Sequence, residues 1–193
     1  MKKLLLFFIV ISLTAAANAG MIVTNLSLDG EGVINATDAY NTTVSPGVGI
    51  AAEYLGGMQG INNMKVGLGS EYLFPRAVTA GGYTGFMPVY VTGQYAFCST
   101  GSWKPYVKVN LGYDLVFNGD SAFKFNNSAV LNGGIYYAAG LGSNICKDTI
   151  AELMYSTYVG SWSSVTPSAG TLIANDTYTV LGLKIGYCFD LSK

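Results

Sequence analysis

The sequence contains no histidine and little charge, since Asp, Glu, Lys and Arg make up only 11% of its 193 residues. Without an imidazole there is no Ser–His or Cys–His pair to activate a nucleophile, and no histidine ligand for a metal. We therefore predict that the protein is not an enzyme and has no metal site and no cofactor. The 10 basic residues form no run, so a nucleic-acid partner has no electrostatic basis.

Long apolar runs are missing too, with one exception at the N-terminus. Lys2 and Lys3 precede the apolar residues 4–13, and Ala17-Asn18-Ala19 has the small-x-small pattern of a signal-peptidase site. This predicts a secretory signal peptide over residues 1–19 and one domain over residues 20–193, with an uncleaved N-terminal anchor as the alternative. A helix needs about 20 apolar residues to span a membrane, and no later segment approaches that length. A chain with so little charge and no segment for a membrane-spanning helix favours a closed β-barrel, the other structure that can span a membrane.

What the chain has instead is alternation of apolar and polar residues in segments of about ten, the length of a tilted barrel strand. In the last segment Leu181 and Leu183 begin an apolar face, and Gly182 and Lys184 begin a small or charged face. Successive side chains of a strand point to opposite sides, so this pattern predicts a strand with one apolar face. The predicted strands are residues 21–29, 48–54, 64–74, 87–97, 106–117, 135–145, 150–161 and 181–191.

Short and long connections between these strands alternate strictly. The short ones are residues 56–63, 99–104 and 147–149, and the long ones are residues 30–46, 75–85, 118–132 and 162–176. Outer-membrane barrels have short periplasmic turns and long extracellular loops. The alternation requires the weakly patterned strand at residues 21–29 and an even number of strands. We therefore predict an all-β, eight-stranded antiparallel up-and-down transmembrane β-barrel with both termini in the periplasm.

Periodicity alone does not say which face meets lipid. Ordinary soluble domains carry about 25% charged residues, so the low charge favours an apolar exterior in a bacterial outer membrane. A soluble, lipocalin-like periplasmic carrier is the alternative. Aromatic residues near strand ends on the apolar face predict an interfacial girdle against the lipid headgroups, although strands are rich in aromatics in any case. They are Tyr54, Tyr72, Tyr95, Phe97, Tyr113, Phe117, Tyr187 and Phe189.

Signal sequence, alternating strands and asymmetric loops together resemble the small outer-membrane barrels of the OmpA/OmpX type. The resemblance covers the chain after residue 19 and is one of pattern. In the last strand Lys184, Gly186, Phe189 and Leu191 occupy the places of that family's assembly signal. The resemblance implies that the barrel-assembly machinery recognises this strand.

Charged residues on the polar face predict a network inside the barrel. If the 56–63 hairpin is centred near Gln59, Glu53 lies opposite Lys65 and the two form a cross-strand pair. Eight strands leave an interior that side chains just fill, which favours a structural network over a polar path for solutes. The predicted members are Glu53, Lys65, Glu71, Lys108, Asp114, Glu152, Lys184 and Asp190.

Three cysteines, Cys98, Cys146 and Cys188, each end a descending strand on the polar phase. We predict that they surround the periplasmic mouth. Each pair is at least two strands apart, about 9–10 Å, beyond the roughly 7 Å that a disulfide tolerates. This favours free thiols, with one strained disulfide or a three-thiolate metal site as alternatives.

The four long loops, rich in Asn, Thr, Ser and Gly, are the expected place for recognition. We expect a structural or surface-interaction protein that contacts outer-membrane lipid and, through its loops, an extracellular ligand or host surface. Alternatives are a narrow conduit for small solutes and, as above, a soluble carrier.

Overall fold

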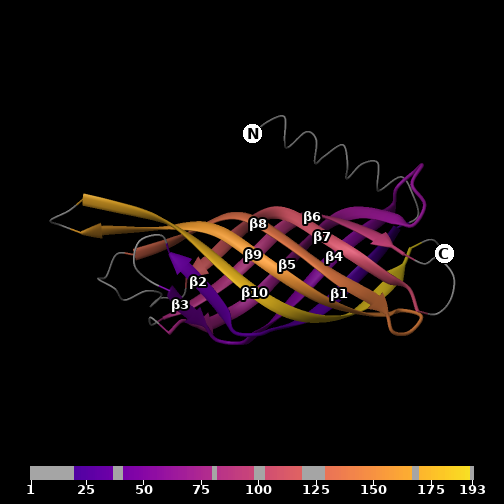
Figure 1. Ribbon diagram of the computed structural model, residues 1–193, viewed down its shortest axis with the longest axis horizontal. Coiled ribbons are helices and arrows are strands. Elements are labelled where there is room, and N and C mark those ends of the chain that lie inside the picture. The colour runs from indigo at the N-terminus through magenta and orange to yellow at the C-terminus, as the bar shows by residue number, and fades with distance from the viewer. Residues whose placement is uncertain are drawn as a thin grey trace.

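The computed structural model describes residues 20–36, 41–79, 82–97, 103–118, 129–166 and 170–191 (Figure 1). The predicted signal peptide and Cys98 lie outside these residues. Among the described residues, no helix is long and apolar enough to cross a membrane. The strands are β1 (Gly20–Asp29), β2 (Gly32–Ala36), β3 (Asn41–Val44), β4 (Gly47–Gly57), β5 (Met64–Ala77), β6 (Tyr83–Ala96), β7 (Pro105–Asn118), β8 (Ala129–Asn144), β9 (Thr149–Thr166) and β10 (Gly170–Asp190).

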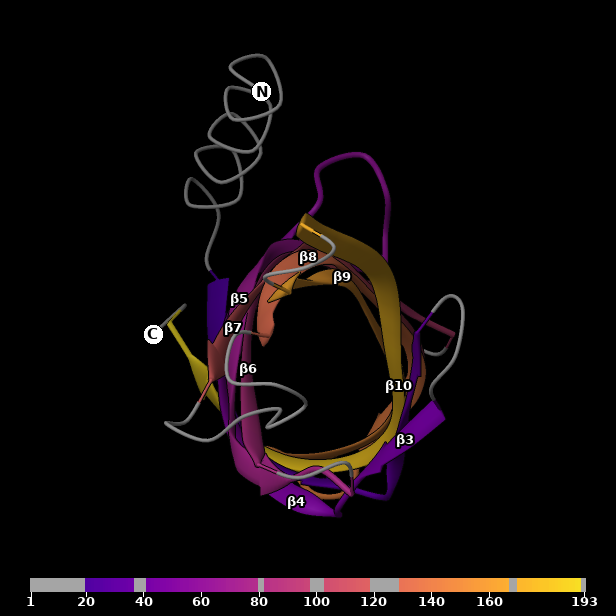
Figure 2. The ribbon, with the colours of Figure 1, turned by 90° about the vertical axis from the view of Figure 1, so that its left-hand side faces the viewer.

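The strands form one closed antiparallel sheet. β1 pairs with β4 on one side and with β10 on the other, and the sheet runs from β4 through β5, β6, β7, β8 and β9 to β10 (Figure 2). The backbone N–H of Leu191 donates to the carbonyl of Gly20 at 2.9 Å, so the described chain begins and ends at the same end of the barrel. This confirms the predicted up-and-down barrel. We call the end that carries Gly20 and Leu191 the periplasmic end.

The short strands β2 and β3 extend the barrel wall rather than adding to its circumference. Asp29 pairs with Gly47 and Gly32 pairs with Val44, so β2 and β3 keep the register of the β1–β4 pair. β2 also pairs with β10, and Val44 pairs with Val78 just beyond β5. The ten strands therefore make eight continuous wall segments, and the predicted number is confirmed.

Two predicted loops are wrong in extent. β2 and β3 occupy much of residues 30–46, and β9 and β10 run through most of residues 162–176. Figure 1 shows β9 and β10 projecting beyond the other strands at the extracellular end. These segments are rich in Thr, Ser and Asn and show no apolar face in the sequence. Pairing with a neighbouring strand keeps them extended, and pairing is not visible in a residue pattern.

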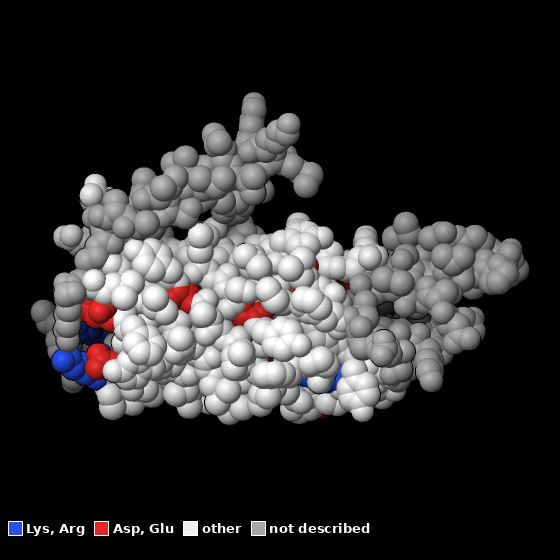
Figure 3. All heavy atoms as spheres, turned by 180° about the vertical axis from the view of Figure 1, so that it is seen from behind, with Lys and Arg blue, Asp and Glu red and all other residues white. Residues whose placement is uncertain are grey.

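The outer face of the barrel is apolar. On β10 the outward residues Leu181, Leu183, Ile185, Tyr187 and Phe189 are exposed, whereas Thr177 and Thr179 follow on the same face nearer the extracellular end. The view in Figure 3 shows a barrel side that is mostly uncharged, with charged side chains clustered at the periplasmic end and a few small charged patches along the barrel. We call this band of outward apolar side chains the apolar belt. Such a belt is the surface of a protein that is embedded in lipid.

The inner face of the barrel is polar and charged in its middle and aromatic toward the extracellular end. Charged side chains such as Glu53, Lys108 and Lys184 are about 98% buried or more although they belong to the polar phase of their strands. Buried charge and exposed leucine are the reverse of a soluble lipocalin-like barrel. The described structure therefore supports the membrane version of the barrel.

A charge on the apolar belt tests this orientation. Leu111 is 58% exposed in the middle of the outer face of β7. An arginine at the bilayer midplane costs about 2–4 kcal/mol, and about 0–1 kcal/mol near the interface. We expect Leu111→Arg to lower the free energy of unfolding from lipid vesicles, measured by urea titration, by about 2–4 kcal/mol.

The matched control is Thr177→Arg, on the outer face of β10 beyond the apolar belt. We expect it to cost less than about 1 kcal/mol. Equal losses in the two variants would contradict the lipid-facing assignment of the belt.

Candidate functional site

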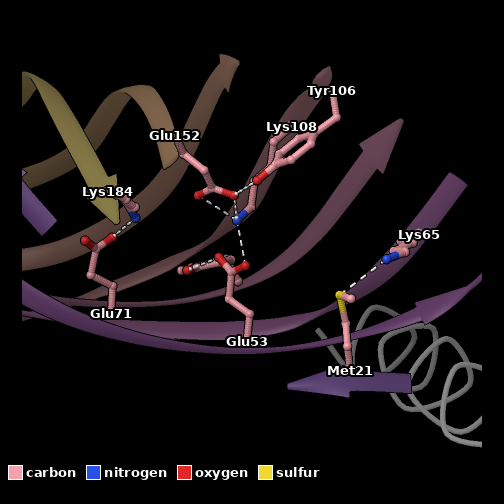
Figure 4. Close-up of polar contacts among 9 residues, drawn as sticks. Met21, Glu53, Lys65, Glu71, Tyr106, Lys108, Glu152 and Lys184 are labelled. Carbon is pink, nitrogen blue, oxygen red and sulfur yellow. Dashed lines mark hydrogen bonds and ion pairs between the residues drawn. The ribbon is translucent and has the colours of Figure 1, made fainter. Parts of the chain in front are cut away.

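The lumen holds a network of ion pairs centred on Lys108 of β7. Its Nζ lies 2.6 Å from Glu53 Oε2 and 2.8 Å from Glu152 Oε1 (Figure 4). All three residues are at least 98% buried. One ammonium thus joins β4 and β9 across the barrel interior through two carboxylates.

Two tyrosines complete the hydrogen bonding of these carboxylates. The Tyr90 hydroxyl donates to Glu53 Oε1 at 2.8 Å, and the Tyr106 hydroxyl donates to Glu152 Oε1 at 2.8 Å. A buried ion pair is tolerated only when its remaining lone pairs and protons are satisfied. The tyrosine hydroxyls do this for the carboxylates, so the protein's own side chains satisfy the hydrogen bonding of the cluster.

Two further ion pairs lie in the lumen. Lys184 of β10 pairs with Glu71 of β5 at 2.5 Å. Arg76 pairs with Asp29 at 2.7 Å, and its Nη1 donates to the Tyr178 hydroxyl at 3.2 Å. We call the residues of these pairs and of the Lys108 cluster the lumen network. It is composed of Asp29, Glu53, Glu71, Arg76, Lys108, Glu152 and Lys184.

Aromatic side chains fill the lumen toward the extracellular end. Phe86 stacks on Tyr178 with ring centroids 4.8 Å apart, and Tyr158 contacts both rings. Tyr136 continues the contact from Tyr158 to Tyr90, with centroid distances of 5.0 and 5.3 Å. We call these five rings the aromatic column. Together with the lumen network it packs much of the described interior with buried side chains.

Apolar residues of the extended wall pack against the aromatic column toward the extracellular end. Ile34 of β2, Val44 of β3 and Val78 are each at least 96% buried and belong to the same apolar cluster as the aromatic column. At the periplasmic end Val23, Leu55, Ile150 and Cys188 form a second apolar cluster. The charged middle of the lumen therefore lies between two apolar clusters.

The predicted pairing of Glu53 with Lys65 is wrong. Lys65 pairs in register with Gly57, and Glu53 pairs with Gly69, so the hairpin is centred on Ile61 rather than on Gln59. Met58 to Asn63 form the turn, with Asn63 at a positive φ of 66°. The Nζ of Lys65 lies instead 3.3 Å from the sulfur of Met21 (Figure 4).

The other charged residues that were predicted to lie inside the barrel are found in three different places. Glu71, Lys108, Glu152 and Lys184 belong to the lumen network, Asp114 is buried outside it, and Asp190 is exposed at the periplasmic end. The prediction missed Asp29, Arg76 and Asp176, which are also buried. Asp29 is on the polar phase of its predicted strand, so the alternation was sufficient to find it. Arg76 and Asp176 lie in segments that were predicted as loops.

The aromatic column was missed as well. Tyr90, Tyr136 and Tyr158 fall on the polar phase of their strands, which is the signal that identifies them as interior. The predicted girdle residues lie on the outer face. Tyr54 and Tyr72 are half-buried there, and the others are 44–59% exposed: Tyr95, Phe97, Tyr113, Phe117, Tyr187 and Phe189. Among them Tyr187 packs edge-on against Phe189 near the periplasmic end, and Tyr72 against Phe117 near the other.

The predicted ring of cysteines at the periplasmic mouth is only partly realised. Cys188 is buried on the inner face of β10 and Cys146 is exposed in the turn between β8 and β9, both as free thiols. Cys146 is at the predicted end of the barrel, but β8 ends at Asn144, so strand alternation does not orient its side chain. Within the described ranges no group of three or more His, Cys, Asp or Glu side chains is arranged to hold a metal ion.

Comparison with known proteins identifies the fold. The outer membrane protein OprG from Pseudomonas aeruginosa matches with a TM-score of 0.57 and 16% sequence identity, over 90% of this chain and 97% of that chain. The outer membrane protein AlkL, determined in DMPC lipid bilayers, matches with a TM-score of 0.57 and 16% identity, over 91% and 92% of the two chains. Neither a family model nor a curated protein sequence matches. The chain has the fold of the small eight-stranded outer-membrane β-barrels, and its apolar belt agrees with a location in the bacterial outer membrane.

Removal of the Lys108 ammonium tests the lumen network. Lys108→Met leaves Glu53 and Glu152 buried without their cation, and breaking a buried ion pair in this way costs about 3–5 kcal/mol. We expect that loss in the free energy of unfolding, measured by urea titration in detergent micelles.

The control is the triple variant Lys108→Met, Glu53→Gln, Glu152→Gln, which removes the uncompensated charge together with the ammonium. Replacing a whole buried ion pair by neutral groups is often close to neutral, so we expect most of the lost stability to return. A triple variant no more stable than Lys108→Met would show that the network does not act through charge compensation.

Proposed function

We propose that the protein is a non-enzymatic outer-membrane barrel whose extracellular extension contacts a ligand or surface outside the cell. The observation that carries the proposal is the combination of a filled lumen with a wall that continues beyond the apolar belt. β9 and β10 pair up to Thr166 and Gly170, well past Leu181, where the apolar belt ends on β10.

The filled lumen favours a scaffold over a pore. The lumen network spans the barrel between β1, β4, β5, β7, β9 and β10, and the aromatic column closes the space above it. An interior packed in this way stabilises the barrel and supports a scaffold role. Rigid walls that carry polar segments beyond the membrane are suited to holding a recognition surface in place.

Trimming the extension tests the proposal. A variant that replaces residues 163–173 by a short Gly-Ser turn removes the projecting part of the β9–β10 pair and leaves the lumen network in place. We expect it to fold with unchanged heat-modifiable mobility on a gel. Cells that display it should attach to a glass surface coated with serum proteins, and aggregate with one another, several-fold less than cells that display the full protein. Unchanged attachment and aggregation by the trimmed, folded variant would contradict the proposed role of the extension.

A second candidate function, a conduit for small apolar solutes, is favoured by one irregularity in the barrel wall. β7 and β8 pair only as far as Tyr113 and Ile135, although β7 continues to Asn118 and β8 begins at Ala129. A small pocket at this point is lined by Val116 of β7 and by Phe86 and Tyr158 of the aromatic column. An apolar solute could enter the upper lumen there from the side.

The two candidates predict different results for Val116→Trp, which fills the pocket with an indole. If the barrel is a surface scaffold, uptake of a fluorescent hydrocarbon by cells that display the variant equals uptake with the unaltered protein. The matched control is Val109→Trp, on the outer face of β7 away from the pocket. Uptake that falls severalfold in Val116→Trp but not in Val109→Trp would support the conduit instead.

A further inference from the structure

Two buried carboxylates near the extracellular end have no cation among the described residues. Asp114 of β7 is 1% exposed and Asp176 of β10 is 5% exposed, and both line the same pocket. Oδ1 of each has no hydrogen-bond partner in the described part of the chain.

The buried bases of the described residues are all engaged elsewhere. Arg76 pairs with Asp29, Lys108 pairs with Glu53 and Glu152, and Lys184 pairs with Glu71. Burying an ionised carboxylate is costly unless the carboxylate is paired or binds a metal. The lumen network follows this rule, and the carboxylates of the pocket depart from it. A ligand that supplies positive charge would bring these two carboxylates into line with the rule.

The backbone around the pocket brings further oxygen atoms to the same place. Asp114, Gly133, Gly160 and Asp176 lie at one level on β7, β8, β9 and β10, where the β8–β9 register shifts between Asn132 and Ile135. A Cβ placed on Gly160 would lie 2.6 Å from the carbonyl oxygen of Asn132 and 3.1 Å from Asp176 Oδ1. A carboxylate oxygen and a carbonyl oxygen therefore converge on the space that this glycine leaves open.

The donor set selects the kind of cation. The polar groups that line the pocket are carboxylate, amide, carbonyl and phenol groups, with neither imidazole nor thiolate among them. Oxygen donors of this type suit Ca²⁺ and Mg²⁺ rather than zinc or copper. Ca²⁺ accepts six to eight oxygens in flexible geometry, whereas Mg²⁺ demands a near-ideal octahedron. Ligands from three different strands at a register shift fit the flexible requirement better.

We propose that Asp114 and Asp176, with the carbonyl oxygen of Asn132, bind a Ca²⁺ ion in this pocket. The ion neutralises both carboxylates and links β7 to β10 at the level where β7 and β8 cease to pair. The site lies toward the extracellular end, so calcium of the medium supplies it. This site is separate from the proposed surface role and does not depend on it.

Calcium titration of the refolded full chain in detergent micelles, after removal of metal with a chelator, tests the proposal. We expect one saturable Ca²⁺ site in calorimetry, with a Kd of about 10⁻⁴–10⁻³ M, the range of extracellular calcium modules. Tyr158 and Tyr178 also line the pocket. Terbium bound there should emit when tyrosine is excited, and Ca²⁺ should displace it.

The variants Asp114→Asn and Asp176→Asn should each raise the Kd for Ca²⁺ at least about tenfold, and the double variant should abolish both calcium binding and terbium emission. The matched control is Glu31→Gln, which removes an exposed carboxylate toward the same end of the barrel and should leave both unchanged. Heat-modifiable mobility verifies that each variant is folded. The proposal is overturned if the unaltered protein shows no saturable calcium binding, or if the double variant binds calcium as tightly as Glu31→Gln does. Binding of tetramethylammonium in place of Ca²⁺ would also overturn it, because the aromatic rings would then be the ligands.

Discussion

In the hydrocarbon interior of a membrane each backbone N–H or C=O without a partner costs several kcal/mol. Pairing of β1 with β10 meets this demand, since it removes both edges of the sheet. Closure also dictates the two faces of every strand, because alternate side chains must then enter lipid or the lumen. The apolar belt, the lumen network and the position of both ends of the described chain all follow from that one closure.

Eight strands enclose a space that side chains can just fill, and the protein fills it in two ways. In the middle of the barrel, charges are compensated by ion pairs and by tyrosine hydroxyls, as Lys108 shows with Glu53 and Tyr90. Nearer the extracellular end, the stacked rings of Phe86 and Tyr178 replace charge. Both solutions favour a rigid, closed barrel, which is why the proposed activity lies outside the membrane rather than through it.

Beyond the apolar belt the wall is no longer constrained by lipid. Polar sequences can pair there, irregularities can be hydrated, and carboxylates can meet ions of the medium. The register shift in β8, the end of β7–β8 pairing and the uncompensated pair Asp114 and Asp176 all occur at the extracellular edge of the belt, where Leu115 and Phe117 of β7 still face outward. The features that distinguish this barrel from a purely structural one are therefore concentrated at the edge of the apolar belt.

The sequence by itself determined the number of strands, their alternating faces and the absence of histidine chemistry, because period-two alternation and loop length are local properties. It located Glu71, Lys108, Glu152 and Lys184 in the interior for the same reason. Only the tertiary structure decided which charges meet. A hairpin centre displaced from Gln59 to Ile61 moved Lys65 away from Glu53. Lys108, 55 residues along the chain from Glu53, took its place. The extension of β2, β3, β9 and β10 was likewise decided by hydrogen bonds to neighbouring strands, which join residues far apart in the sequence and leave no trace in its local pattern.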